Sequence, residues 1–213
     1  MQITWHGLSL FQITTSPEKN VQIKITIDPF DKTTGLRVPK MDSDILLITN
    51  QHNDYNNAKA VAGNPFIIEN PGEYEVKNIF IQGISTPNNN SKEKGRATIY
   101  TIESEGLRIC HLGNLDQREL TEEQLERIGD IDILMISVGG IISGQESKKI
   151  ISQLEPKIII PMRYAIPKLK TKLNPLSDFL KAMGIKSIEP IKKLSIKKKD
   201  LLSDEAKIIV LEQ

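Results

Sequence analysis

Residues 44–55 read Asp-Ile-Leu-Leu-Ile-Thr-Asn-Gln-His-Asn-Asp-Tyr, an apolar run that leads directly into a polar loop. A short apolar run of this kind is typical of a buried strand. Side chains at a strand end are held in place by the sheet, so such loops often carry binding or catalytic residues. Similar polar loops follow apolar runs at 86–88, 111–114 and 161–164. The sequence therefore predicts a site assembled from several strand ends.

The N-terminal half has the pattern of a β-rich structure. Polar turns separate the expected strands, which are 1–14, 21–27, 44–49, 66–68, 72–76, 78–84, 97–104 and 107–112. We expect the first two of these strands to pair around a polar turn at 15–20.

Beyond residue 112 the pattern changes to alternating helices and strands. Thr121-Glu-Glu-Gln124 matches a capping box, in which the Thr and Gln side chains bind free backbone N–H groups at a helix start. The expected helices are 121–128, 146–154 and 175–183, and the expected strands are 131–138, 157–161 and a final pair, 194–197 with 207–211. Two sheets with helices outside would bury these elements, although periodicity alone leaves other α+β layouts open.

The composition fits one globular domain that spans residues 1–213. Apolar residues make up 38% of the chain and charged residues 26%. No apolar run approaches the length that spans a bilayer, and the chain begins without a signal peptide pattern. Cys110 is the only cysteine, so no internal disulfide can form. We expect a cytoplasmic protein that does not contact a membrane.

The net charge of +1 conceals a marked asymmetry along the chain. Residues 1–147 carry 13 Lys and Arg against 20 Asp and Glu, whereas residues 148–213 carry 15 against 7. Residues 148–199 contain 14 basic residues and only 3 acidic ones. Solvated helix faces would explain this segment, and a face that attracts anions, including nucleic acid, is the functional alternative.

The chain resembles the metallo-β-lactamase superfamily, and its UlaG-like branch in particular. The loop at 49–55 is similar to the Thr-His-x-His-x-Asp-His signature of that family. Further segments match the family in order and spacing along essentially the whole chain; they are 4–11, 27–30, 70–76, 109–113, 138–140 and 156–164. The resemblance implies an α+β fold, the four-layer αββα sandwich, with the site of a metal-dependent hydrolase at one edge of the two sheets.

The resemblance also implies where the family's metal ligands would fall, and most of them are replaced. In the family, the first loop supplies three histidines and one aspartate, and two later histidines and a bridging aspartate complete the site. The corresponding residues here are Asn50, His52, Asp54, Tyr55, Asn88, Asn114 and Arg163, with Asn89 as an alternative to Asn88. Leu8 stands where the opening strand of the family has a histidine, and His6 lies two residues before it.

These replacements change what the site could bind. Zinc prefers imidazole, thiolate or carboxylate ligands, and a neutral Asn amide is a poor substitute. Only His52 and Asp54 keep the character of good ligands, and the whole chain has three histidines. Arg163 carries a permanent cation, which cannot bind a metal but can pair with Asp54. We therefore expect no bound metal, with Arg163 filling part of the metals' volume.

Three other residues have structural explanations. His111 lies in an expected core strand, so it is interpreted as a structural histidine with satisfied hydrogen bonds. Its neighbour Cys110 is interpreted as a small buried apolar residue. Asp28, which precedes Pro29, is expected to brace its own turn.

Three hypotheses about function follow. The first is a non-catalytic descendant of a metal-dependent hydrolase, without a cofactor, whose pocket binds a small polar or anionic ligand or mediates assembly into a homo-oligomer. The second is a hydrolase with a single zinc or other divalent metal, held by His52, Asp54 and an unforeseen ligand such as His6. The third is weak nucleic-acid binding through the basic segment. Aromatic residues are only 5% of the chain, which argues against a base-stacking platform.

Overall fold

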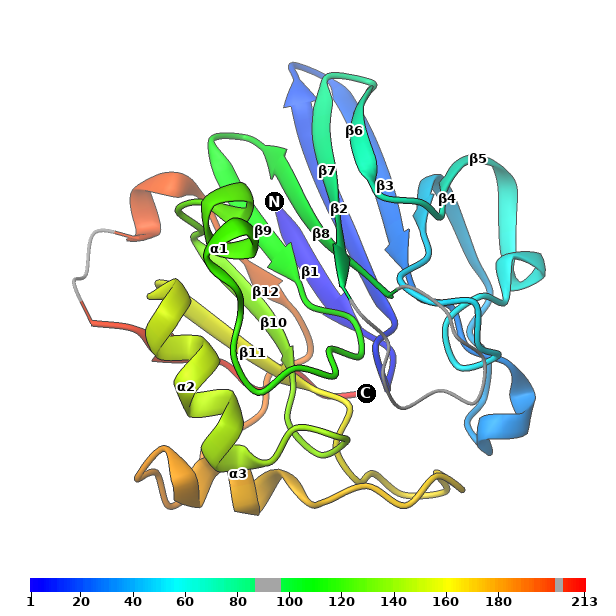
Figure 1. Ribbon diagram of the computed structural model, residues 1–213. Helices are drawn as coiled ribbons and strands as arrows, with labels where there is room; N and C mark the ends of the chain where they lie inside the picture. Colours follow the sequence, from blue (N-terminus) through cyan, green and yellow to red (C-terminus); the bar gives the residue numbers. More distant parts are fainter. Residues whose placement is uncertain (87–96, 202–204) are drawn as a thin grey trace.

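The computed structural model describes residues 1–86, 97–201 and 205–213, and it contains two β-sheets packed face to face (Figure 1). The six-stranded sheet has the order β12 (Leu194–Ser195), β1 (Gln2–Trp5), β2 (Phe11–Glu18), β3 (Val21–Ile27), β4 (Met41–Leu47) and β5 (Val61–Ile68). The seven-stranded sheet has the order β13 (Lys207–Ile208), β11 (Ile158–Met162), β10 (Ile133–Ser137), β9 (Leu107–His111), β8 (Ala97–Ser104), β7 (Ile79–Thr86) and β6 (Gly72–Val76).

The apolar run at 44–49 shows why both faces of the six-stranded sheet are covered. Ile45 and Leu47 belong to the main core between the sheets. Leu46 and Ile48 point to the other face and join a second buried cluster. Successive side chains of a strand point to opposite faces, so a continuous apolar run requires cover on both sides.

Different elements cover the two outer faces. Three α-helices, α1 (Glu122–Ile128), α2 (Gly144–Leu154) and α3 (Leu176–Ala182), pack on the seven-stranded sheet (Figure 1). The second cluster on the six-stranded sheet is covered by loops with the short 3-10 helices η1 (Lys32–Thr34) and η2 (Ala58–Ala60). The predicted sandwich is confirmed, although one of its outer layers has only 3-10 turns in the described ranges. No helix of those ranges is long and apolar enough to cross a bilayer.

Most expected elements are present with shifted ends, and the first one is corrected. Residues 1–14 do not form one strand, because the backbone reverses at Gly7 and Leu8, whose φ angles are 104° and 49°. Two antiparallel strands, β1 and β2, result. The expected turn at 15–20 is also shorter, since β2 continues through an irregularity to Glu18. The capping box at Thr121 is confirmed, and a second one at Ser143, which was not predicted, starts α2 two residues early.

The expected pairing of the last two strands is wrong. Residues 194–195 form β12, which pairs with β1 of the six-stranded sheet, and residues 207–208 form β13, which pairs with β11 of the other sheet. Each segment completes the free edge of a different sheet, which satisfies backbone groups that would otherwise be unpaired. An isolated β-bridge between Ile191 and Leu211 connects the segments that contain β12 and β13.

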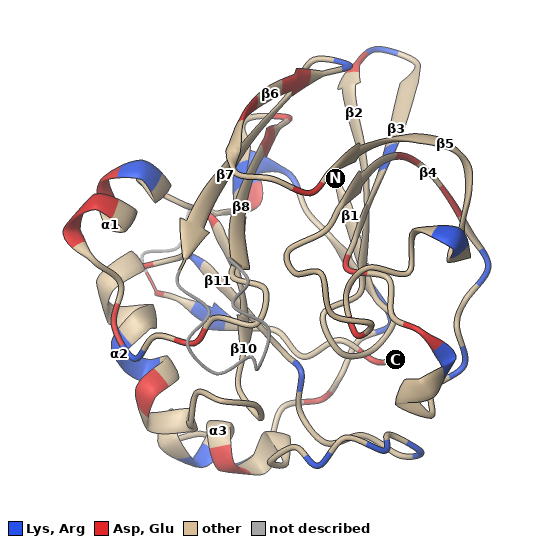
Figure 2. Ribbon diagram, turned by 45° about the vertical axis from the view of Figure 1, so that its right-hand side comes forward, with Lys and Arg blue, Asp and Glu red and all other residues tan. Residues whose placement is uncertain are grey.

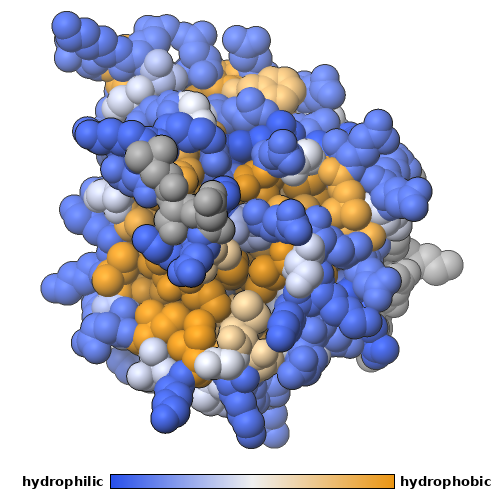
Figure 3. Space-filling model, turned by 90° about the vertical axis from the view of Figure 1, so that its left-hand side faces the viewer, coloured by the Kyte–Doolittle hydropathy of each residue, from blue (hydrophilic) through white to orange (hydrophobic). Residues whose placement is uncertain are grey.

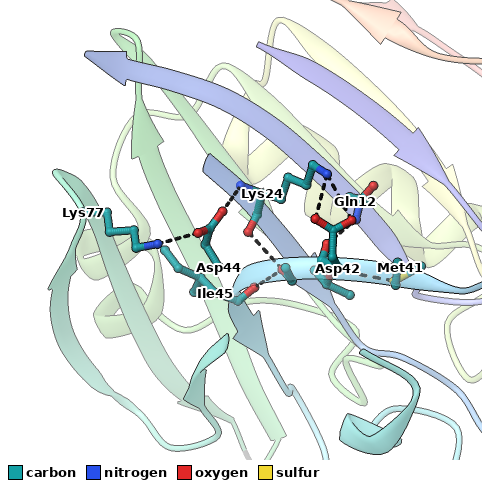
Figure 4. A network of polar contacts seen from close by, with 9 residues as sticks. Gln12, Lys24, Met41, Asp42, Asp44, Ile45 and Lys77 are labelled. Atoms are coloured by element: carbon teal, nitrogen blue, oxygen red, sulfur yellow. Dashed lines mark hydrogen bonds and ion pairs between the residues drawn. The ribbon is translucent and has the colours of Figure 1, made fainter. Parts of the chain in front are cut away.

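A polar network joins the two sheets at the end away from the site loops (Figure 4). The Lys24 ammonium donates to the Asp42 carboxylate at 2.9 Å, and the Lys24 backbone N–H donates to Asp44 Oδ2 at 2.9 Å. Lys77, in the turn between β6 and β7, also donates to Asp44. The Lys24 side chain holds the pKa of Asp42 below its usual value. Because these side chains are all at least partly exposed to solvent, their ion pairs contribute little to stability.

Candidate functional site

The described polar loops, at 49–55, 111–114 and 161–164, lie at one edge of the sandwich, the lower edge in Figure 1, whereas the loop at 86–88 extends beyond the described residues. Strands β3 and β4 are parallel to each other, as are β9, β10 and β11, so each group ends at a common edge. Hydrogen bonds connect the two sets of loops. The Arg163 N–H donates to the Leu8 carbonyl at 3.2 Å, and the Thr98 N–H donates to the Thr49 carbonyl at 2.9 Å. The strand ends of the two sheets therefore lie next to each other at this edge, and their role as a site stays a prediction.

Three non-glycine residues at this edge adopt the left-handed backbone conformation. Their φ angles are 49° for Leu8, 53° for Asp28 and 56° for Arg163. Such conformations cost about 1–3 kcal/mol each and persist only where surrounding contacts impose them. At Leu8, the carbonyl accepts hydrogen bonds from both the Trp5 indole at 2.8 Å and the Arg163 N–H. The strained backbone aims the Arg163 side chain into the space between the sheets' ends.

Arg163 is the central side chain of the site. Only 9% of it is exposed, and its Nη2 lies 3.6 Å from Asp54 Oδ2. Its guanidinium carbon lies 4.9 Å from the centre of the Tyr55 ring, which is a cation–π contact. Its Nε and Nη1 are buried without a hydrogen-bond partner in the described part of the chain. The predicted Arg163–Asp54 pair is confirmed as an ion pair, although its length shows that it is not a bidentate hydrogen bond.

His52 does not face this cation. Its side chain is 65% exposed, and its Nδ1 accepts a hydrogen bond of 3.3 Å from the Asp54 N–H within the same loop. The side-chain oxygen of Asn50 accepts from the His52 N–H at 2.8 Å. These bonds make Asn50 and His52 parts of the loop's own turn structure. Of the two good ligands in the first loop, only Asp54 lies against the buried site.

The described residues at two other positions implied by the resemblance, Tyr55 and Asn114, are poor metal ligands, and His6 is a further imidazole at this edge. Tyr55 is buried, and burial raises the pKa of its phenol, which keeps it neutral. Asn114 presents a buried amide oxygen without a hydrogen-bond partner in the described ranges. His6 has a buried Nε2 atom, and burial lowers its pKa. Asn88 and Asn89 lie outside the described residues. Within the described ranges, no group of three or more His, Cys, Asp or Glu side chains could hold a metal ion.

Asp28 has a larger role than predicted. It does not brace its own turn: its two carboxylate oxygens accept hydrogen bonds of 2.7 Å from the backbone N–H and the hydroxyl of Thr49. Asp28 therefore ties the end of β3 to the first site loop. Complete burial raises the pKa of Asp28 to about 8, while the Thr49 hydrogen bonds and the Arg163 charge act in the opposite direction.

The predictions for His111 and Cys110 are confirmed. His111 is fully buried, and its Nδ1 accepts a hydrogen bond of 3.1 Å from the Gly113 N–H. Its Nε2 lies 3.1 Å from the Ser9 carbonyl, so the neutral tautomer with the proton on Nε2 satisfies both contacts. Burial lowers the pKa of His111 to about 4. Cys110 is fully buried beside it, and burial raises the pKa of its thiol.

Two residues of the site were not identified from the sequence as binding groups. The hydroxyl oxygen of Ser137, at the end of β10, is buried without a hydrogen-bond partner in the described ranges. A methyl group placed on Gly140 would lie 3.3 Å from this oxygen, and 3.6 Å from both Arg163 Nε and Asn114 Oδ1. A space of atomic size beside Gly140 is therefore surrounded by three polar atoms. The glycine pair at 139–140 was a possible signal of this space.

A larger cavity, of about 840 Å³, lies at the opposite edge of the seven-stranded sheet. Figure 3 shows the face that is on the left in Figure 1, where apolar surface is exposed between hydrophilic side chains. Several charges of the cavity are paired with one another, as in the contacts of Arg108 with Glu103 at 3.0 Å and of Lys198 with Asp132 at 2.7 Å. The described family positions are not part of its lining, so the Arg163 site is the better candidate.

The basic segment 148–199 does not gather into one stripe. Figure 2 shows Lys and Arg distributed over α2, α3 and the loop between β11 and α3, with acidic positions interleaved on the helices. Lys149 and Lys198 are each paired with a carboxylate. Weak binding of polyanions therefore stays a prediction from composition.

Comparisons with known proteins agree with the fold, although the relatives are named as metal-dependent hydrolases. The family described as Beta-lactamase superfamily domain matches residues 2–163. A UPF0173 metal-dependent hydrolase of Thermococcus onnurineus is 26% identical over 195 residues, covering 77% of this chain and 84% of that protein. A solved structure from Thermotoga maritima, described as a candidate Zn-dependent hydrolase of the metallo-β-lactamase superfamily, is 34% identical, with a TM-score of 0.79, covering 99% of this chain and 97% of that one. A metallo hydrolase of Ignicoccus hospitalis shares the fold. It is 17% identical with a TM-score of 0.60, and the match covers 92% of this chain and 99% of that one.

Proposed function

Because this chain belongs to the metallo-β-lactamase superfamily but its ligand positions do not suit the metals of that family, we propose that it is a non-catalytic, metal-free member that uses the former active site to bind a ligand. The observation that carries this proposal is the buried Arg163 at the position of the last histidine. A guanidinium cannot lose its proton to become a ligand, and its charge repels a divalent ion.

The rest of the site supports the same function. Asp54, the one inward carboxylate of the first loop, is paired with Arg163. His52 is turned to solvent by hydrogen bonds within its loop. Without a metal to activate water, the site lacks an activated nucleophile in the described ranges: Tyr55 is kept protonated, and the Ser137 hydroxyl has no hydrogen-bond partner there that could act as a base. Binding, rather than hydrolysis, is what these groups can perform.

The names of the relatives favour a second candidate, a hydrolase with one divalent metal. In this chain it would depend on His52 and Asp54, whose Nδ1 and Oδ1 atoms lie 3.8 Å apart. Membership of the UlaG-like branch, a cytoplasmic location and assembly into a homo-oligomer stay hypotheses from the sequence.

Metal content separates the two candidates. Protein purified without affinity nickel or chelators is expected to hold far less than one zinc, iron or manganese ion per chain. Added metal is expected to leave its melting temperature unchanged, because only a ligand that prefers the folded state stabilises it. Elemental analysis and thermal unfolding with each metal would measure both quantities.

The matched control is His52→Ala, which removes an exposed imidazole and should alter neither result. About one metal per chain in the wild type, lost in His52→Ala, would disprove the metal-free proposal and support the single-metal hydrolase.

A further inference from the structure

The space beside Gly140 has the features of a binding position for an oxygen atom. An atom at the position of a Gly140 methyl group would be 3.3–3.6 Å from Ser137 Oγ, Arg163 Nε and Asn114 Oδ1. A shift of a few tenths of an ångström brings an oxygen there within hydrogen-bonding distance of these groups. Arg163 Nε and the Ser137 hydroxyl can donate to it, and rotation of the Asn114 amide would present a third donor.

Unsatisfied polar groups extend beyond this one point. Besides the three atoms around Gly140, Arg163 Nη1 and the Tyr55 hydroxyl are buried without hydrogen-bond partners in the described ranges. A buried polar atom without a partner costs about 1–3 kcal/mol. One water molecule beside Gly140 would serve the three atoms around it. A ligand with several oxygen atoms can in addition supply acceptors for Arg163 Nη1 and the Tyr55 hydroxyl.

The charge of the site favours an anion. Among the described residues, Arg163 forms an ion pair with Asp54 at 3.6 Å. A second carboxyl group that interacts with the Arg163 charge, that of Asp28, uses both oxygens to accept hydrogen bonds from Thr49. The Nε edge of the guanidinium therefore faces the polar space without a carboxylate of its own, and the low local dielectric strengthens its attraction for a negative charge.

On the premise of the proposed function, we propose that Arg163, Ser137 and Asn114 bind one small oxyanion, a phosphate or a carboxylate group of a small molecule, with one anion oxygen beside Gly140. The guanidinium supplies the charge, and the Ser137 hydroxyl and Asn114 amide set the position of the oxygen. The ring of Tyr55 contacts the cation, with its centre 4.9 Å from the guanidinium carbon.

Gly140→Ala provides a sharp test, because its methyl group would fill the proposed oxygen position. Its nearest contacts, at 3.3–3.6 Å, involve side-chain atoms, so the variant should fold. Wild-type protein is expected to bind inorganic phosphate or acetate saturably at constant ionic strength, measured by calorimetry and thermal shift. Gly140→Ala and Ser137→Ala are expected to weaken binding roughly 10- to 100-fold, the effect of losing a charge-assisted hydrogen bond. Comparing phosphate with acetate distinguishes the two anion sources.

Lys148→Ala is the matched control, since it removes an exposed cation of α2 outside the site and should leave affinity unchanged. Absence of saturable binding of both anions, or equal affinity in wild type and Gly140→Ala, would overturn the inference and leave a water-filled space. The metal assay is independent of this result. A metal-free protein that binds neither anion would refute only the oxyanion site, whereas stoichiometric metal would refute the proposed function.

Discussion

Gly139→Ala is expected to destabilise the protein by roughly 3 kcal/mol or more, because the new methyl group has no space. It would lie 2.6 Å from the Asn174 carbonyl oxygen, 2.7 Å from the Tyr164 Cα and 2.9 Å from the Arg163 carbonyl oxygen. All three are backbone atoms, which cannot rotate away as side chains do. The Gly139 N–H and carbonyl are themselves bonded to Arg163 and Asn174, at 3.2 and 2.8 Å. The melting temperature should fall by roughly 10 °C.

The neighbouring Gly140→Ala is the control for this prediction. Its methyl group meets only side-chain atoms at 3.3 Å or more, so its stability should stay within about 1 kcal/mol of the wild type. Thermal or urea unfolding of the two variants measures the contrast. Equal stability of both variants would show that the close approach at Gly139 does not constrain the Arg163 loop.

The second large expected effect is that His111 makes the free energy of unfolding depend on pH in the acid range. Its folded-state pKa of about 4 lies below the ordinary value of 6.5, so the unfolded chain binds the proton first as pH falls. The neutral imidazole contributes fully to the free energy of unfolding above pH 6.5, and this contribution is lost as pH falls toward 4. The shift corresponds to roughly 3 kcal/mol across that window. His111→Gln, which cannot be protonated, should lack this loss.

The measurement is the difference in free energy of unfolding between wild type and His111→Gln from pH 8 to 4. At pH 8 the variant should be less stable by roughly 1–3 kcal/mol, because a buried contact to Ser9 or Gly113 is lost. That deficit should shrink or reverse toward pH 4. The pH dependence of wild-type stability alone does not isolate His111. Because the pKa of Asp28 is raised to about 8, protonation of Asp28 stabilises the folded state as pH falls from about 8. The exposed His52→Gln is the control, and a pH-independent deficit in His111→Gln would contradict the assignment.

Local patterns predicted much of the fold. The apolar run 44–49 predicted a buried strand, and the strand is covered on both faces. The capping box at Thr121 predicted the start of α1. Both patterns lie in residues that are close together in the sequence. The pairing of β12 and β13 with different sheets could not be predicted in the same way. It depends on which sheet edges remain free after every other strand has paired, and short two-residue strands carry almost no periodicity.

In the candidate site, too, some features could be predicted from the sequence, whereas most contacts between distant segments could not. The resemblance predicted a replacement at each ligand position, which stays a prediction, and it predicted the pair of Arg163 with Asp54, which the structure contains. The outward turn of His52 was not predicted, because it results from hydrogen bonds with Asp54 and Asn50 that depend on loop conformation. The attachment of Asp28 to Thr49 and the space beside Gly140 depend on contacts between separate strand ends, which spacing along the chain does not encode.

The pairing of β1 with β12 has a consequence for synthesis of the chain. Met1 and Ile196 are hydrogen-bonded neighbours although 195 positions separate them. At about 5–20 residues per second, β1 waits on the order of ten seconds or more for its outer partner to be translated. During that interval the outer edge of β1 lacks the partner that it has in the finished sheet, and such edges are prone to pair with other chains. The six-stranded sheet is therefore complete only after residues 194–195 have been translated, and until then the outer edge of β1 is open to pairing with other chains.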